Sequence, residues 1–409
     1  MGGSLSGFMN ILWVKSGGML PADTGGRKRS LAMLREISRA GHRVTFLALT
    51  PAGSSVAQAE LDDEYAAEKI WVEWTEPRRR SIIFFAGLLK NLFFSSRPYV
   101  LDKYRSTAWR KKIIETASKV DLVVCDFLTP APNFVGLNVP VPIVLFQHNI
   151  ESQIWKRLAD TATNSLSRVY LRKQYQRMKA WEQRLSAEFT GVITVSPDDA
   201  DFCRDSYRLT NVLGDVPTGV DVSVFNLPVT EAGSCIGFLG SMDWMPNVEG
   251  VLRFTTRILP IIRSRMPSVR LKIIGRNPTI AVRQLAQADP LVEVTGTVDE
   301  VQSHVHECSV MVVPLMAGGG TRIKIFECMA MGVPVVSTTI GAEGLPVSDG
   351  QEILIADEDE AFADAVLRLL DDREMARGLA ARARTWVAER YSWHAAGARF
   401  IDLCQQTLN

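Results

Sequence analysis

The chain has 409 residues, of which 46% are hydrophobic and 22% charged, a composition typical of a globular enzyme with about two or three domains. The net charge of +1 gives no indication of nucleic-acid binding, and none is expected. The six cysteines form no CxxC pair, which favours reduced thiols in a cytoplasmic protein over disulfides or a zinc site. No apolar stretch is long enough to span a bilayer, and the N-terminal run FMNILWV lacks the basic flank of a signal peptide.

Short apolar runs rich in β-branched residues alternate with helical stretches along the chain. This alternation predicts βαβ units and parallel sheets, because strands buried on both faces are apolar throughout. Helices are predicted at 25–40, where Gly41 ends the pattern, and over the charged stretch 151–188. The predicted strands are 8–14, 43–49, 69–74, 121–125, 142–146 and 191–195 in the first half, and 235–240, 269–275, 291–296, 309–314, 333–337 and 352–355 in the second.

Residues 213–234, rich in Gly, Pro, Ser and Thr, separate the two series of strands and are predicted to link two domains. The sequence therefore predicts an α/β protein with two Rossmann-like, doubly wound domains, residues 1–215 and 216–385. These domains are expected to face each other across a cleft, since ligands of such sheets bind outside the carboxyl ends of the strands. The last residues, 386–409, are predicted to be helical.

The most informative stretch is 314–346, which has the pattern of a strand end, a glycine-rich turn, a short helix and a second strand. The glycines 318–320 permit positive φ and a close approach of a ligand to the backbone. Thr321 is a suitable N-cap, and Arg322 and Lys324 add positive charge where the helix dipole is already positive. These features predict a phosphate site.

Glu327 follows Lys324 by one helical turn on the same face, so its carboxylate is within reach of ribose hydroxyls when a diphosphate occupies the turn. The alternative is an ordinary turn between strand and helix, with Glu327 as a surface ion-pair partner of Lys324. The run of three glycines followed by Arg and Lys favours the ligand interpretation.

This stretch resembles the donor-binding region of the group 1 glycosyltransferases of family 4, which are retaining enzymes with the GT-B fold. The resemblance implies transfer of a sugar from a nucleotide-diphosphate donor to a glycan or lipid-linked acceptor, in cell-surface polysaccharide or glycoconjugate biosynthesis. It also implies that the C-terminal helix, 386–409, packs back on the N-terminal domain. It extends over nearly the whole chain, through PADTGGRKR (21–29), FQHNIES (146–152), PTGVDVSVF (217–225), GSMDWMPNVEG (240–250) and the run 333–354.

The sequence departs from the family pattern at two places. Most members carry two glutamates eight positions apart, and here the first position is Gly319. The family often places an Arg and a Lys for the diphosphate within 240–250, where this chain has Ser241, Asp243 and Asn247 instead. We therefore expect Arg322 and Lys324 to hold the diphosphate.

The resemblance assigns further donor contacts in the C-terminal domain. The ribose is expected at Glu327, and the base at the backbone of Val298, although such turns are common. Ser241 and the main chain of Gly319, Gly320 and Thr321 complete the expected donor site.

In the N-terminal domain, Gly25 and Gly26 resemble the family's flexible loop, where acceptor and donor phosphate meet at a helix N-terminus. Arg27 and Asn149 are the expected acceptor contacts, although the Arg27 cluster also suits a solvated helix start. His148 follows a strand and by resemblance contacts the donor sugar. The alternative for His148 is a satisfied loop residue.

Two acidic triplets, 199–201 and 357–359, have the spacing of a metal-binding DxD motif. Both have the pattern of helix starts, where acids favour the dipole, so no metal and no cofactor besides the nucleotide sugar is expected. Residues 78–99 join a basic cluster to an apolar, aromatic run. They suit either a buried crossover helix or a peripheral contact with the inner face of the plasma membrane.

Three alternative functions stay open. One is a nucleotide-sugar epimerase of the same fold. Another is an enzyme like glycogen phosphorylase, although no lysine for pyridoxal phosphate stands out. The third is a non-catalytic sugar-nucleotide-binding subunit, which Gly319 suggests because it replaces a carboxylate.

Overall fold

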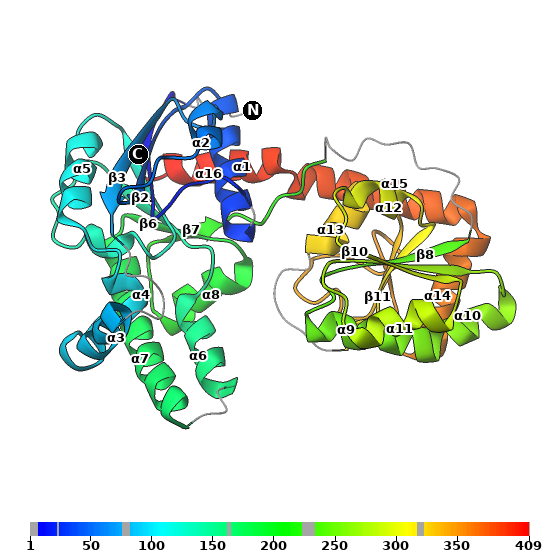
Figure 1. Ribbon diagram of the computed structural model, residues 1–409. Coiled ribbons are helices and arrows are strands. Elements are labelled where there is room, and N and C mark those ends of the chain that lie inside the picture. The colour runs from blue at the N-terminus through cyan, green and yellow to red at the C-terminus, as the bar shows by residue number, and fades with distance from the viewer. Residues whose placement is uncertain are drawn as a thin grey trace. The chain divides into compact units, whose positions relative to one another are not determined.

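The computed structural model describes residues 7–22, 24–75, 82–161, 165–222, 234–316 and 323–408, without the side chains of 82–86, 161 and 166. The chain divides into two compact units. Unit 1 comprises Met1–Thr218 together with Ala396–Asn409, and unit 2 comprises Gly219–Ala395. Each unit is a parallel sheet covered by helices (Figure 1), as the alternating pattern predicts.

Unit 1 contains a seven-stranded sheet in the order β3-β2-β1-β4-β5-β6-β7. The order reverses between β1 and β4, which is the switch point where ligands bind in doubly wound sheets. Its strands are β1 (Asn10–Lys15), β2 (Arg43–Pro51), β3 (Glu68–Trp74), β4 (Leu122–Asp126), β5 (Ile143–Phe146), β6 (Gly191–Thr194) and β7 (Val212–Asp215). Its helices are α1 (Gly25–Arg39), α2 (Gln58–Asp62), α3 (Ile82–Phe94), α4 (Tyr99–Asp102), α5 (Thr107–Ala117), α6 (Glu151–Thr161), α7 (Ser165–Glu188), α8 (Pro197–Ser206) and the short 3-10 helix Ala131–Asn133.

Unit 2 contains a six-stranded sheet in the order β10-β9-β8-β11-β12-β13, with its switch point between β8 and β11. Its strands are β8 (Cys235–Leu239), β9 (Arg270–Ile274), β10 (Val292–Gly296), β11 (Val310–Val313), β12 (Val335–Ser337) and β13 (Leu354–Ile355). Its helices are α9 (Met245–Arg253), the π-helical turn Phe254–Ile258, α10 (Leu259–Arg265), α11 (Ile280–Ala288), α12 (Val301–His306), α13 (Ile323–Ala330), α14 (Asp359–Asp371) and α15 (Arg373–Tyr391).

The central strands are buried on both faces, which explains their continuous apolar runs. β7, which pairs with β6, overlaps the first three residues of the predicted linker 213–234, so the linker begins later than its composition indicates. Helix α16 (Trp393–Gln405) passes from unit 2 into unit 1 after Ala395. Within unit 1, Phe400 of α16 lies 5.6 Å from Trp13 and 5.0 Å from Phe146, measured between ring centroids.

In the described part of the chain, no helix is both long and apolar enough to cross a bilayer.

Candidate functional site

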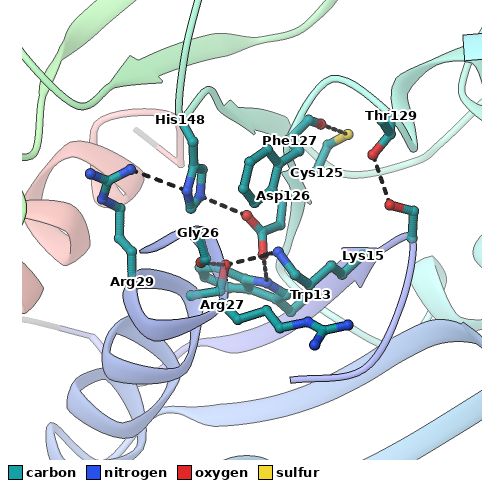
Figure 2. A network of polar contacts seen from close by, with 12 residues as sticks. Trp13, Lys15, Gly26, Arg27, Arg29, Cys125, Asp126, Phe127, Thr129 and His148 are labelled. Carbon is teal, nitrogen blue, oxygen red and sulfur yellow. Dashed lines mark hydrogen bonds and ion pairs between the residues drawn. The ribbon is translucent and has the colours of Figure 1, made fainter. Parts of the chain in front are cut away.

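A buried polar network lies at the carboxyl ends of three neighbouring strands of unit 1 (Figure 2). Lys15 is the last residue of β1, Asp126 is the last residue of β4, and His148 follows the end of β5 by two residues. Because parallel strands end at the same edge of a sheet, these residues converge at the switch point although they lie far apart in the sequence.

Asp126 is the centre of this network and is fully buried. Its Oδ2 accepts hydrogen bonds from Lys15 Nζ at 2.7 Å and from Trp13 Nε1 at 2.9 Å. Its Oδ1 lies 2.8 Å from His148 Nε2. Lys15 Nζ also donates to Ser30 Oγ at 2.9 Å, which ties β1 and β4 to helix α1.

The charges of the network follow from these contacts. Burial alone would raise the pKa of Asp126, but Lys15 and His148 outweigh it and hold this pKa below its usual value. Burial lowers the pKa of His148 to about 4, even though Asp126 favours the charged ring. Asp126 and Lys15 form a buried pair in which burial lowers the pKa of Lys15 and the neighbouring Asp126 opposes this shift. His148 is uncharged at neutral pH.

Both ring nitrogens of His148 face groups of unit 1. Arg29 Nη1 lies 3.3 Å from His148 Nδ1, and since an arginine side chain only donates, Nδ1 must be the acceptor and the ring proton must be on Nε2, towards Asp126. The ring is 2% exposed and stacks on Phe127, with 3.8 Å between centroids. The structure thus places His148 at the predicted strand end, where its ring is buried and its Nδ1 faces Arg29.

Arg29 is held at both ends of its guanidinium, because Nη2 donates to Thr218 Oγ1 while Nη1 contacts His148. Its Nε is buried and has no hydrogen-bond partner among the described residues. Burial lowers the pKa of Arg29 to about 10, against the opposing charges of Asp126 and Asp199, so the side chain stays charged at neutral pH.

The predicted glycine loop lies at the start of α1. Thr24 is the N-cap, and its Oγ1 accepts from Arg27 N at 3.4 Å. A Cβ on Gly26 would lie 2.4 Å from Cζ of Phe127, so this position has no room for a side chain. Arg27 turns its guanidinium to the carbonyl of Pro21 at 3.2 Å.

Glu182 of α7 fixes the loop that carries His148. Its Oε1 accepts from Gln147 Nε2 and from the backbone N–H of Glu151, both at 2.7 Å. Its Oε2 accepts from the N–H of Ser152 at 2.9 Å and from the hydroxyl of Tyr207 at 2.6 Å. Burial raises the pKa of Glu182, while these donors lower it. Asn149, at the tip of this loop, is exposed.

In unit 2, residues of two predicted motifs come together at the carboxyl edge of the sheet. Lys324, in the first turn of α13, donates from Nζ to Asn247 Oδ1 at 2.8 Å and lies 4.8 Å from the centre of the Phe238 ring. Asn247 Nδ2 donates to the carbonyl of Ser241 at 2.9 Å. The 240–250 loop and the start of α13 therefore form one cluster, although about 80 residues separate them in sequence.

The loop after β9 joins the same cluster. Arg276 Nε donates to Ser241 Oγ at 3.0 Å, and Ser241 Oγ donates to Asp243 Oδ1 at 2.6 Å. Asn277 Nδ2 donates to the other carboxylate oxygen of Asp243 at 3.0 Å. Arg276 was not among the residues predicted from sequence, and its only signal there was its position directly after an apolar strand.

The remaining predicted donor residues divide into two groups. Glu327 and Val298 are both partly exposed, and Val298 contacts the apolar core of unit 2. The predicted residues Gly319, Gly320, Thr321 and Arg322 lie outside the described part of the chain.

The acidic triplets are engaged by protein groups. Asp357 accepts from the N–H and the hydroxyl of Thr339, both at 2.8 Å, and Asp359 pairs with Arg253 at 2.7 Å. Asp201 pairs with Arg204 at 3.1 Å. Over the ranges that the structure describes, no group of three or more His, Cys, Asp or Glu side chains could hold a metal ion.

Comparison with known proteins agrees with this architecture. A family model described as "Glycosyltransferase Family 4" matches residues 24–224, and one described as "Glycosyl transferases group 1" matches residues 233–372. An "Uncharacterized 44.6 kDa protein in cps region" of Klebsiella pneumoniae is 21% identical over 384 residues, which are 91% of this chain and 93% of that protein.

A GDP-mannose-dependent alpha-(1-6)-phosphatidylinositol monomannoside mannosyltransferase of Mycolicibacterium smegmatis is 30% identical over 161 residues, or 36% of this chain and 42% of that enzyme. Among solved structures, a glycosyltransferase from Rickettsia africae has a TM-score of 0.63 at 15% identity and covers 98% of this chain and 99% of its own.

The two Rossmann-like sheets and the structural similarity over the whole chain define a protein of the GT-B fold. The two family matches make the assignment narrower: the chain belongs to the group 1 glycosyltransferases of family 4.

Proposed function

We propose that this glycosyltransferase moves a sugar, with retention of anomeric configuration, from a nucleotide-diphosphate donor to a glycan or lipid-linked acceptor in cell-surface glycan biosynthesis. The observation that carries this proposal is the cluster beyond the end of β8, in which Lys324 donates to Asn247 and Asn247 donates to the carbonyl of Ser241. The K. pneumoniae relative in a cps region and the GDP-mannose-dependent relative support this choice of donor and acceptor classes.

Negative charge builds up on the diphosphate as the sugar leaves, so fixed cations aimed at it supply the main catalytic contribution. Lys324 is fixed by Asn247 in the first turn of α13, and Arg322 precedes that helix in sequence. We assign both to the diphosphate, with Ser241 and the main chain of Gly319, Gly320 and Thr321 as further donors. Loss of one such donor typically slows the reaction by about 100- to 1000-fold.

Two further contacts complete the donor site as we propose it. Glu327, one turn beyond Lys324, accepts from the ribose hydroxyls, in the way that an acidic residue holds the ribose in dinucleotide sites. The backbone of Val298 contacts the base.

In unit 1 we assign Gly25 and Gly26 to the donor, and Arg27 and the exposed Asn149 to the acceptor. The geometry supports an indirect role for His148, because Nδ1 faces Arg29, Nε2 lies 2.8 Å from Asp126 Oδ1 and the ring is 2% exposed. We propose that the neutral ring positions Arg29, and that Arg29 supplies a positive charge near the carboxyl edge of the unit 1 sheet.

Fixed cations can neutralise the leaving diphosphate without a metal ion, so we propose that activity needs none. The engagement of Asp357, Asp359 and Asp201 by protein groups supports this, since none of the three carboxylates is held ready for a metal.

We also propose a peripheral contact of α3 with an anionic lipid surface. Arg177 of α7 donates to the carbonyls of Asn91 at 3.0 Å and Leu92 at 2.8 Å, which anchors one side of the helix end. Phe93 and Phe94 remain 70% and 86% exposed, and Lys90 is exposed nearby. Exposed aromatic rings beside a cation suit the boundary between headgroups and acyl chains.

Vesicle co-sedimentation tests the membrane contact. A Phe93→Glu/Phe94→Glu double variant should sediment with phosphatidylglycerol vesicles at least tenfold less than wild type, because burying each Phe contributes about 1.5–3 kcal/mol. Leu61→Glu, at another exposed apolar residue of unit 1, is the matched control and should leave sedimentation unchanged. Equal sedimentation of a folded double variant and wild type would exclude this surface.

A thermal-shift screen tests the donor site. Sugar nucleotides of GDP, UDP, ADP, TDP and CDP are added at increasing concentration, and a ligand at 100 times its Kd should add about 2.7 kcal/mol of stability. Arg322→Ala should abolish the shift and Glu327→Gln should weaken it. Equal shifts for wild type and Arg322→Ala would contradict the charge assignment, and a shift without release of sugar to acceptor or water would favour a non-catalytic binding subunit.

A further inference from the structure

We infer that Arg276 is a phosphate-binding residue of the donor site, a role that rests on the proposed use of a nucleotide-diphosphate sugar. Residues 240–250, the loop after β8, contain neither Lys nor Arg. Cations that bind a phosphate at this loop must therefore come from other segments of the chain. Arg276 and Lys324 are the two cations whose side chains bond to this loop among the described residues.

The backbone fixes the position of Arg276 against this loop. β8 and β9 are neighbours in register, and their extensions stay paired: Gly240 N donates to the carbonyl of Ile274 at 3.0 Å, and Met242 N donates to the carbonyl of Arg276 at 2.9 Å. A Cβ on Gly275 would lie 1.7 Å from the carbonyl oxygen of Gly240, so only glycine permits this approach. The backbone of Arg276 is therefore held in a fixed position at the carboxyl edge of the sheet.

The side chain is oriented but not neutralised. Nε is bound to Ser241 Oγ, and within the described ranges neither terminal NH2 group has a hydrogen-bond partner and no carboxylate lies within ion-pair distance. Asp243, the nearest acid in the loop, is bound by Ser241 and Asn277 instead. An arginine held through Nε presents its two terminal N–H groups side by side, which matches two oxygens of a phosphate.

Ser241 connects the two cations. Its hydroxyl holds Arg276, and its carbonyl holds Asn247, which in turn holds Lys324. Arg276 is thus bonded directly to Ser241, and Lys324 is linked to it through Asn247, near the switch point between β8 and β11, where a ligand of this sheet binds. Two cations held by one loop, one through Ser241 and one through Asn247, suit a ligand with two adjacent phosphates.

Calorimetric titration tests this role in the full chain. The diphosphate among GDP, UDP, ADP, TDP and CDP that wild type binds tightest is titrated into Arg276→Ala, Arg276→Lys and Arg283→Ala. Arg283, seven residues away on α11 and exposed, provides the same loss of charge without contact to the loop. Binding of the nucleoside that corresponds to this diphosphate is measured in parallel by ligand-observed NMR at millimolar concentration.

The diphosphate should bind Arg276→Ala about 10- to 100-fold more weakly, which is the effect of losing hydrogen bonds to a charged group. Arg276→Lys should recover part of the loss, and Arg283→Ala and nucleoside binding should stay within about twofold of wild type. Equal diphosphate affinity in Arg276→Ala and Arg283→Ala would overturn the inference about Arg276 but leave the proposed function standing. The same holds if Arg276→Ala loses as much affinity for the nucleoside as for the diphosphate. Failure of wild type to bind any of the five would overturn the proposed function and this inference with it.

Discussion

Replacing His148 by Gln tests the buried network of unit 1 through its pH dependence. The His148 pKa is about 4 in the folded chain, against about 6.5 for an unperturbed histidine. Between these values the unfolded chain binds a proton that the folded chain does not, so stability falls as pH falls. Over pH 7.5 to 4.5 the pKa shift corresponds to a loss of about 2 to 3 kcal/mol for wild type, and the Gln variant lacks this contribution.

Hydrogen exchange of the amides of β1 and β4 in the full chain measures this, since their protection reports the opening of unit 1. Protection free energies, corrected for intrinsic exchange, are compared between wild type and His148→Gln at each pH. Glu151, whose pKa burial raises to about 7, contributes with the opposite sign, but it is present in both chains and cancels in the difference. His394→Gln, at an exposed histidine, is the control and should follow wild type.

A difference that changes by less than about 1 kcal/mol over this range would refute the reasoning. The ring would then not be held neutral between Asp126 and Arg29, and the indirect role proposed for His148 would fall with it.

Three further predictions concern other contacts. Gly275→Ala should leave unit 2 misfolded or abolish nucleotide binding, because its Cβ meets the Gly240 carbonyl at 1.7 Å, and near-wild-type melting and binding would contradict this close approach. Glu182→Gln should lower the protection of the first turn of α6 by about 2–3 kcal/mol, since an amide NH2 would face the backbone donors that the carboxylate accepts; unchanged exchange there would show that Glu182 does not hold the loop. EDTA should leave transferase activity within about twofold, and activity restored only by added Mg²⁺ or Mn²⁺ would refute the metal-free mechanism.

The fold was largely predictable because most of its strands are buried on both faces and therefore appear as uninterrupted apolar runs. β7 is the exception. Val212–Asp215 is short, only partly buried and contains Gly214, so its sequence resembles a linker, and only its pairing with β6 makes it a strand.

The candidate site was predictable where residues form a local pattern. Gly25, Gly26 and Lys324 lie at helix starts that composition alone marks, and the structure places them at the carboxyl edges of their sheets. The roles of Asp126 and Glu182 could not be predicted from the sequence, because a single acid at a strand end or in a basic helix does not indicate which residues it contacts.

The sequence by itself determined the alternation of strands and helices, the two-domain division and the helix start at Gly25 and Gly26, because these depend on residues close together in the chain. Only the tertiary structure decided that Asp126 binds both Lys15 and His148, and that Ser241 joins Arg276 to Asn247. These contacts join residues at or beyond the carboxyl ends of different strands of one sheet. The order of the parallel strands, which brings those ends together, is a property of the folded chain.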